Sequence, residues 1–122
     1  EPAEEHKRVY NAVLETQLGA LGMMKPGVKA EDVDTYSREI LKKYDLAQYF
    51  GHGLGHGLGS AVHDVGRMGQ KSEDVLEEGQ IWTVEPGVYI PGFGGVRIED
   101  DVVITKDGID ILTKTPKELL CF

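Results

Sequence analysis

The sequence is poor in cysteine, in basic residues and in long apolar runs. Cys121 is the only cysteine among 122 residues, which excludes a disulfide framework and favours a reducing, cytoplasmic location. Thirteen basic residues stand against twenty-one acidic ones, a net charge of −8, whereas nucleic-acid surfaces need clustered Lys and Arg. No apolar run approaches the roughly 20 residues of a membrane span. We therefore expect neither a nucleic-acid partner nor a membrane partner.

Glycine, in contrast, is abundant. The chain has sixteen glycines, twelve of them between Gly51 and Gly95, which is about twice the average usage. Hydrophobic residues make up 40% and charged residues 28%, a profile typical of a folded chain rather than a disordered one. No repeat or linker divides the sequence, so residues 1–122 are predicted to form one unit with a modest core.

Two helices are expected in the first fifty residues. From Pro2 to about Met24, apolar residues recur at three- and four-residue spacing, and the following Lys-Pro-Gly sequence ends the helix. A second helix is predicted from about Ala30 to Lys43, with a weak start because Lys29 occupies the N-cap position. The residues expected to face inward are Val9, Val13, Leu14, Leu18 and Leu21, then Val33, Tyr36, Ile40 and Leu41.

The remainder of the chain favours strands. Segments rich in Val and Ile and bounded by Gly and Pro predict strands at 80–85, 87–90, 96–104 and 109–112. Lys106-Asp107-Gly108 indicates a hairpin turn, and Pro116 to Leu120 suits a short closing helix. The predicted fold class is α+β, with two N-terminal helices followed by an antiparallel sheet.

Residues 51–63 read GHGLGHGLGSAVH, and three interpretations of this segment compete. A helix would align His52, His56 and His63 as in a helical zinc motif, but each interior glycine would cost about 1 kcal/mol relative to alanine. A flexible loop with incidental histidines is disfavoured by the apolar residues between them. An extended segment fits better, because its side chains then share one face and the bare glycine face allows another backbone to approach.

Two glutamates flank a glycine-rich loop. A hairpin centred on Gly92 would place Glu85 directly opposite Glu99, and two facing carboxylates repel each other. A cation is therefore expected between them. Arg97 on the same face is one candidate, which gives a purely structural ion pair. A divalent metal is the other, because carboxylates and imidazoles are ordinary metal ligands.

Three strings together resemble the pita-bread metallopeptidases, the family of methionine aminopeptidase, aminopeptidase P and Xaa-Pro dipeptidase. They are HGLGHGLGSAVHDVG at 52–66, WTVEPGVYIPGFGGVRIEDDVVIT at 82–105 and, more loosely, EEHKRVYNAVLETQ at 4–17. The HGLGH doublet and the position of Arg97 two residues before Glu99 are similar to the proline-specific branch. The resemblance implies a partial pita-bread fold, the C-terminal part of a creatinase/aminopeptidase-like catalytic domain.

The resemblance also implies roles for individual residues. The metal ligands would be His56, Glu85 and Glu99, with Glu85 also the general base and Glu99 bridging two ions. His63 would contact the scissile peptide, as a catalytic and substrate-binding residue. His52 and Arg97 would shape the pocket that accepts proline.

In the family, two aspartates on strands before the first helix complete the ligand set, and no such strand precedes the first helix here. The resemblance therefore implies the C-terminal catalytic half of a proline-specific peptidase that uses two divalent ions (Mn, Co or Zn) on peptides with proline in second position. Alone, the chain is expected to bind metal weakly, to be inactive, and to pair with its missing half or with itself. The alternative is a non-catalytic module that binds peptides or partners.

Overall fold

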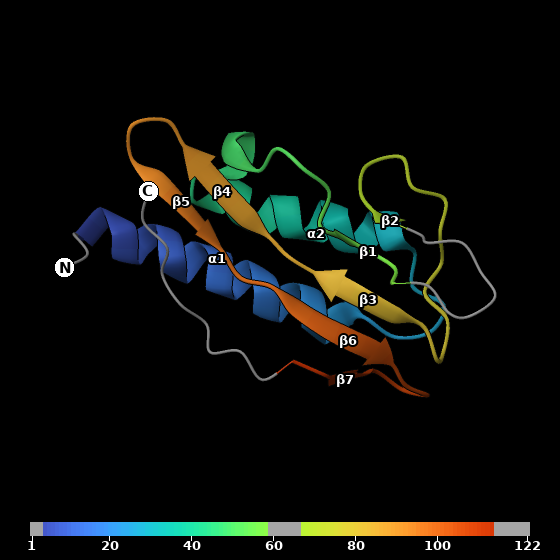
Figure 1. Ribbon diagram of the computed structural model, residues 1–122. Helices are drawn as coiled ribbons and strands as arrows, with labels where there is room; N and C mark the ends of the chain where they lie inside the picture. The colour runs from blue at the N-terminus through green and yellow to red at the C-terminus, as the bar shows by residue number, and fades with distance from the viewer. Residues whose placement is uncertain (1–3, 59–66, 114–122) are drawn as a thin grey trace.

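The computed structural model describes residues 4–58 and 67–113 (Figure 1). Helix α1 spans Glu4–Met23, α2 spans Ala30–Lys43, and η1 is a short 3-10 helix at Ala47–Tyr49. The two long helices confirm the predicted ones. No side chain caps the start of α2 at Lys29, as its sequence predicts. None of the described helices is long and apolar enough to cross a membrane.

In the described part of the chain seven short strands follow the helices, and all their pairings are antiparallel. This arrangement confirms the α+β class. The strands are β1 (Gly55–His56), β2 (Arg67–Met68), β3 (Ile81–Val84), β4 (Gly87–Ile90), β5 (Gly94–Arg97), β6 (Asp100–Ile104) and β7 (Ile109–Ile111). Strand β1 pairs with β2, β4 with β5, and β6 lies between β3 and β7. The predicted turn between β6 and β7 is present, with the Thr105 amide donating to the Gly108 carbonyl at 2.9 Å.

Strands β3 to β6 form one long hairpin that is interrupted in the middle. The β4–β5 and β3–β6 ladders both have the register of a hairpin centred on Gly92, as predicted, and Figure 1 shows them following each other across the helices. The single strand predicted at 96–104 is wrong, because the ladder breaks at Ile98–Glu99. Pro86 lies opposite this break and has no amide hydrogen to continue the ladder; its carbonyl accepts from the Ile98 amide at 3.1 Å.

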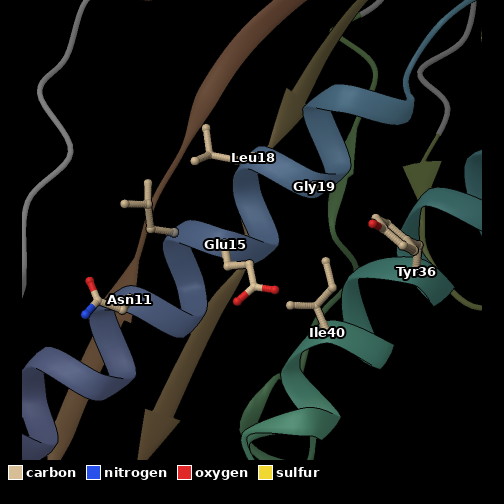
Figure 2. Close-up of a pocket in the computed structure, with 7 residues that line it drawn as sticks. Asn11, Glu15, Leu18, Gly19, Tyr36 and Ile40 are labelled. Atoms are coloured by element: carbon tan, nitrogen blue, oxygen red, sulfur yellow. The ribbon is translucent and has the colours of Figure 1, made fainter.

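The core lies between the helices and the strands, and two predicted core residues are not in it. Leu18 is 55% exposed and Tyr36 is 46% exposed. Helix α1 buries Val9, Val13 and Leu21 as predicted, together with small and polar residues. Gly19 lies so close to α2 that an added Cβ would be 2.7 Å from Ile40 Cδ1. This close crossing turns Leu18 and Tyr36 outward. They line a surface pocket of about 460 Å³ between the helices, together with Asn11, Leu14, Glu15, Gly19 and Ile40 (Figure 2).

Two predicted features lie outside the described residues. One is the closing helix at Pro116–Leu120, and the other is the end of the glycine-histidine string, which includes His63. The strand predicted at 109–112 is present as β7, one residue shorter.

Candidate functional site

The glycine–histidine segment, defined here as residues 51–58, is extended rather than helical. The Leu58 amide donates to the Ile81 carbonyl at 2.8 Å, and β1 pairs with β2. A Cβ added to Gly55 would lie 2.0 Å from the Thr83 carbonyl oxygen, and one added to Gly53 would lie 2.8 Å from the Met68 carbonyl oxygen. The bare face of the segment therefore accommodates two other backbones, as expected from the alternation of glycine with larger residues.

The structure brings His56 and Glu85 together. His56 Nε2 lies 3.6 Å from Glu85 Oε2, with the histidine side chain 50% exposed and the glutamate side chain 19% exposed. Glu85 lies at the break in the long hairpin, where its amide donates to the Leu54 carbonyl at 2.7 Å. This hydrogen bond connects the glutamate to the glycine–histidine segment. Two residues that are far apart in the sequence thus meet at the edge of β3.

Thr83 connects these two residues and was not predicted from the sequence. Its hydroxyl accepts the His56 amide at 2.9 Å and donates to Glu85 Oε2 at 2.8 Å. The threonine is only 3% exposed. Strand alternation, which places Thr83 and Glu85 on the same face, was the available signal. The hydroxyl therefore orients one oxygen of the Glu85 carboxylate toward the histidine.

His56 and Glu85 form a donor set that suits a metal ion. His56 Nδ1 lies 3.2 Å from the Gly57 carbonyl oxygen; because a carbonyl only accepts, this contact favours a proton on Nδ1 and leaves the lone pair on Nε2. The 3.6 Å between Nε2 and Oε2 is close to the roughly 3.4 Å between two ligands on one tetrahedral ion. An imidazole nitrogen and a carboxylate oxygen are both ordinary ligands for Zn, Mn and Co.

Glu99 is placed differently from the other two predicted ligands. Its register position is opposite Glu85, but its carboxylate lies 3.8 Å from an Arg97 nitrogen, with both side chains nearly half exposed. The structural ion pair considered for Arg97 is therefore present. Within residues 4–58 and 67–113, no three His, Cys, Asp or Glu side chains gather closely enough to hold a metal ion. The structure brings together His56 and Glu85 and leaves the Glu99 carboxylate apart.

His52 lies among aromatic rings at the start of the segment. Its imidazole meets the Phe50 ring edge-on, with centroids 5.0 Å apart and planes at 87°. The Tyr89 ring on β4 lies 6.2 Å away. The Phe50 and Tyr89 rings offer flat apolar surface close to the polar imidazole of His52. None of the predicted site residues lines the pocket between α1 and α2 in Figure 2.

Comparison with known proteins finds that the chain is similar to proteins named as dipeptidases, prolidases and aminopeptidases. It is 50% identical over 119 residues to the Xaa-Pro dipeptidase of Pyrococcus furiosus, covering 98% of this chain and 34% of that protein. Its structure matches the prolidase from Pyrococcus horikoshii with a TM-score of 0.90 at 48% identity, over 98% of this chain and 35% of that one. It also matches the X-Pro aminopeptidase from Thermotoga maritima with a TM-score of 0.89 at 40% identity, over 98% of this chain and 34% of that one.

The chain thus spans about a third of the length of these relatives. The likeness confirms the expected partial pita-bread fold, with two helices followed by antiparallel strands. The model of metallopeptidase family M24 matches residues 1–106. Because that match includes both helices, the glycine–histidine segment and the long hairpin, the chain belongs to metallopeptidase family M24.

Proposed function

We propose that these residues are the C-terminal catalytic half of a proline-specific, dinuclear-metal peptidase that hydrolyses Xaa-Pro peptides. The observation that supports this most directly is the pairing of His56 with Glu85, whose Nε2 and Oε2 atoms lie 3.6 Å apart beside an orienting threonine. The relatives named Xaa-Pro dipeptidase, prolidase and X-Pro aminopeptidase point to the substrate class. The domain is then a part of a creatinase/aminopeptidase-like catalytic domain.

His56, Glu85 and Glu99 would hold two divalent ions (Mn, Co or Zn) together with ligands from the rest of the protein. Two such ions, when bound, supply a hydroxide nucleophile and stabilise the oxyanion. Glu85 would act as the general base, because its carboxylate is partly buried and is oriented by a hydrogen bond. Glu99 would need to leave Arg97, and two half-exposed side chains permit that movement at little cost.

The proline side of the substrate would lie near the aromatic rings of the site. His52, with the Phe50 and Tyr89 rings around it, offers apolar surface for a pyrrolidine ring, which has no amide hydrogen to donate. Arg97 is nearly half exposed and could pair with a substrate carboxylate. His63, which lies outside the described residues, is proposed to contact the scissile peptide.

Alone, the 122 residues are proposed to bind metal weakly and to be inactive. Three protein ligands would remain for two ions, and an ion with too few carboxylates is held loosely. The partner would be the missing N-terminal half or a second copy of the chain, in a reducing cytoplasm that suits the single cysteine.

One observation favours the alternative of a non-catalytic module that binds peptides or partners. The Glu99 carboxylate pairs with Arg97. His56 and Glu85 have no third metal-ligating side chain beside them among the residues that the structure describes. A site that stays in this arrangement would bind a peptide through its rings and charges without cleaving it.

Metal titration followed by a peptidase assay tests the proposal. The 122-residue chain is titrated with Mn²⁺ in a calorimeter and then assayed on an Xaa-Pro dipeptide, with an Xaa-Ala dipeptide as the specificity control. We expect weak binding and no cleavage. The protein that contains the whole family domain should cleave the Xaa-Pro peptide and should lose nearly all turnover on Glu85→Gln, whereas Glu78→Gln, at an exposed turn, should have no effect.

Two outcomes would contradict the proposal. Robust, Mn²⁺-dependent cleavage by the 122-residue chain would show that the residues present suffice for activity. Wild-type turnover by Glu85→Gln at excess metal would remove the role proposed for Glu85. Peptide binding without cleavage by the whole domain would instead support the binding module.

A further inference from the structure

Helix α2 contains a buried ion pair that faces the glycine–histidine segment. Arg38 Nε lies 2.8 Å from Asp34 Oδ2, and Arg38 Nη2 donates to Asp34 Oδ1 at 3.4 Å. The Asp34 side chain has no exposed surface, and that of Arg38 is 20% exposed. An (i, i+4) pair on a helix surface contributes only a few tenths of a kcal/mol, so the burial of this pair calls for a separate explanation.

Three further hydrogen bonds join the pair to the backbone that leads into the site. Arg38 Nη1 donates to the Phe50 carbonyl at 3.0 Å, and Nη2 donates to the His52 carbonyl at 2.8 Å. Asp34 Oδ1 accepts the Leu54 amide at 3.1 Å. One ion pair therefore binds the backbone at every second residue of this stretch, at Phe50, His52 and Leu54.

The guanidinium also contacts an aromatic ring of the site. Its carbon lies 4.4 Å from the centre of the Phe50 ring, and this ring in turn meets the His52 imidazole edge-on. A cation above the ring face restrains the ring, so Arg38 restrains both the main chain of His52 and the position of its side chain.

The stretch from Phe50 to Leu54 needs such a restraint. Among the described residues it belongs to no strand, because β1 begins at Gly55. The Glu85 amide binds the Leu54 carbonyl at its end, but the glycines at 51 and 53 leave the preceding backbone free to adopt many conformations. His52 lies within the stretch and His56 follows it by two residues. A shift of the stretch would move both histidines.

We propose that Asp34 and Arg38 are positioning residues that place His52 and His56 for binding of substrate and metal. The expected effects on metal and substrate binding rest on the proposed peptidase function. The restraint on the backbone of residues 50–54 can be measured independently of that function. A buried ion pair is often no more stabilising than well-packed apolar residues. Apolar residues would leave two carbonyls and one amide without partners, so the value of the pair lies in the geometry it imposes.

The test uses substitutions that keep the charge or the shape. Arg38→Lys retains the positive charge but loses the planar fork that binds two carbonyls and a carboxylate. Arg8→Lys is the matched control, because Arg8 is an exposed arginine that also binds a carboxylate, of Glu5, and a main-chain carbonyl, of Tyr44. The Asp34→Asn/Arg38→Gln double variant is used if the single variant does not fold, since it leaves no buried charge unpaired.

Three quantities are measured, and they separate positioning from stability. Hydrogen exchange over residues 50–56 is measured on the chain itself and needs no metal. Mn²⁺ affinity and the KM for an Xaa-Pro dipeptide at saturating Mn²⁺ are measured on the protein with the whole family domain. All measurements are made far below the unfolding temperature, where a residue that only stabilises the fold would leave Mn²⁺ affinity and KM unchanged and would raise exchange in α1 as well as over residues 50–56.

For Arg38→Lys we expect exchange over residues 50–56 to rise at least about tenfold and exchange in α1 to stay the same. Mn²⁺ binding should weaken by about 10–100-fold, the range typical of residues that orient metal ligands, and KM should rise even at saturating Mn²⁺. Arg8→Lys should change none of these values. Wild-type exchange, Mn²⁺ affinity and KM in a variant with a lowered unfolding temperature would overturn the proposal.

The outcomes also distinguish this inference from the proposed function. If the wild-type domain neither binds Mn²⁺ nor cleaves Xaa-Pro peptides, the peptidase proposal fails, and the exchange result still decides whether the ion pair restrains the segment. If the wild type is active and the variants exchange and bind as it does, only the positioning role fails.

Discussion

In the helix pair the contacts are made by side chains, whereas in the glycine–histidine segment the backbone itself makes the contact. Gly22 in α1 has nothing within 4 Å of an added Cβ, so this position would accept a larger residue. At Gly55, the same Cβ would lie 2.0 Å from the Thr83 carbonyl oxygen. Glycine is therefore dispensable where the surface is open and required where two backbones touch, and in this chain two backbones touch at the candidate site.

The largest expected effect is that of Gly55→Ala. The new methyl group would collide with the backbone of β3, which cannot move without disrupting the β3–β6 ladder. We expect a loss of at least about 3 kcal/mol in the free energy of unfolding, measured by urea denaturation. Gly51→Ala, in the same segment but with nothing within 4 Å, should change it by less than about 1 kcal/mol. Equal effects at both positions would show that the close approach of the two backbones at Gly55 does not require glycine.

Thr83→Val should have the next largest effect. Valine matches threonine in shape but cannot accept the His56 amide or donate to Glu85. Leaving a partly buried amide without a partner costs up to about 1–3 kcal/mol, and losing the group that orients Glu85, a proposed metal ligand, should weaken metal binding about 10–100-fold. Urea denaturation and Mn²⁺ calorimetry measure the two effects.

Thr83→Ser is the control for this prediction. Serine keeps the hydroxyl and loses one methyl group, so metal affinity should stay within a few fold of the wild type while stability falls slightly. If valine and serine weaken Mn²⁺ binding equally, the effect comes from packing and not from the hydroxyl.

Much of the fold follows from local patterns in the sequence. The bounds of the helices follow from apolar spacing and from the Lys-Pro-Gly sequence that ends α1. The register of the long hairpin follows from its turn at Gly92, because one turn determines the pairing on both of its sides. The extended form of the glycine–histidine segment follows from the cost of four glycines in a helix.

The rest depends on contacts between distant elements, which local patterns do not encode. Leu18 and Tyr36 have helical spacing appropriate to a core, yet the close crossing at Gly19 exposes them. Thr83 has an ordinary strand alternation, and its role depends on the segment that approaches it. Nothing in the sequence distinguishes Asp34 from other acidic residues on a helix. Its role depends on the Leu54 amide, which lies 20 residues away in the sequence and donates to its carboxylate.

Within α1, Gly22→Ala should stabilise the protein modestly. Alanine lowers the entropy of the unfolded chain and favours the helix, so a gain of about 0.5–1 kcal/mol is expected from urea denaturation. Gly19→Ala is the control in the same helix, since its methyl group would lie 2.7 Å from Ile40 Cδ1 and 3.1 Å from the Tyr36 ring. Its gain should be smaller or absent. A larger gain at Gly19 than at Gly22 would contradict the close helix crossing.

The smallest expected effect concerns pH and the contact between α1 and the end of α2. The Tyr44 hydroxyl donates to Glu15, and the Lys43 ammonium also donates to it, so the pKa of the Glu15 carboxyl lies below its ordinary value of 4.5. The hydrogen bond to Glu15 raises the pKa of Tyr44 above 10.0 and that of Lys43 above 10.5. A group whose pKa is lowered by folding stabilises the fold at pH values above its pKa in the unfolded chain. This contribution is lost as the pH falls through its pKa in the folded protein.

The sign is opposite for the two raised groups, whose contribution is complete below their unfolded pKa values and is lost as pH rises through the folded ones. The Glu15 contacts should therefore stabilise the protein most between about pH 4.5 and 10. In urea denaturation the difference between the wild type and Tyr44→Phe should be present at pH 7 and should shrink below pH 4.5, as Glu15 becomes protonated. Glu15→Gln should remove the same pH-dependent part of the stability, whereas Glu5→Gln at the exposed Arg8 pair should retain it. A difference between the wild type and Tyr44→Phe that stays constant from pH 3 to pH 7 would show that Tyr44 acts by packing alone.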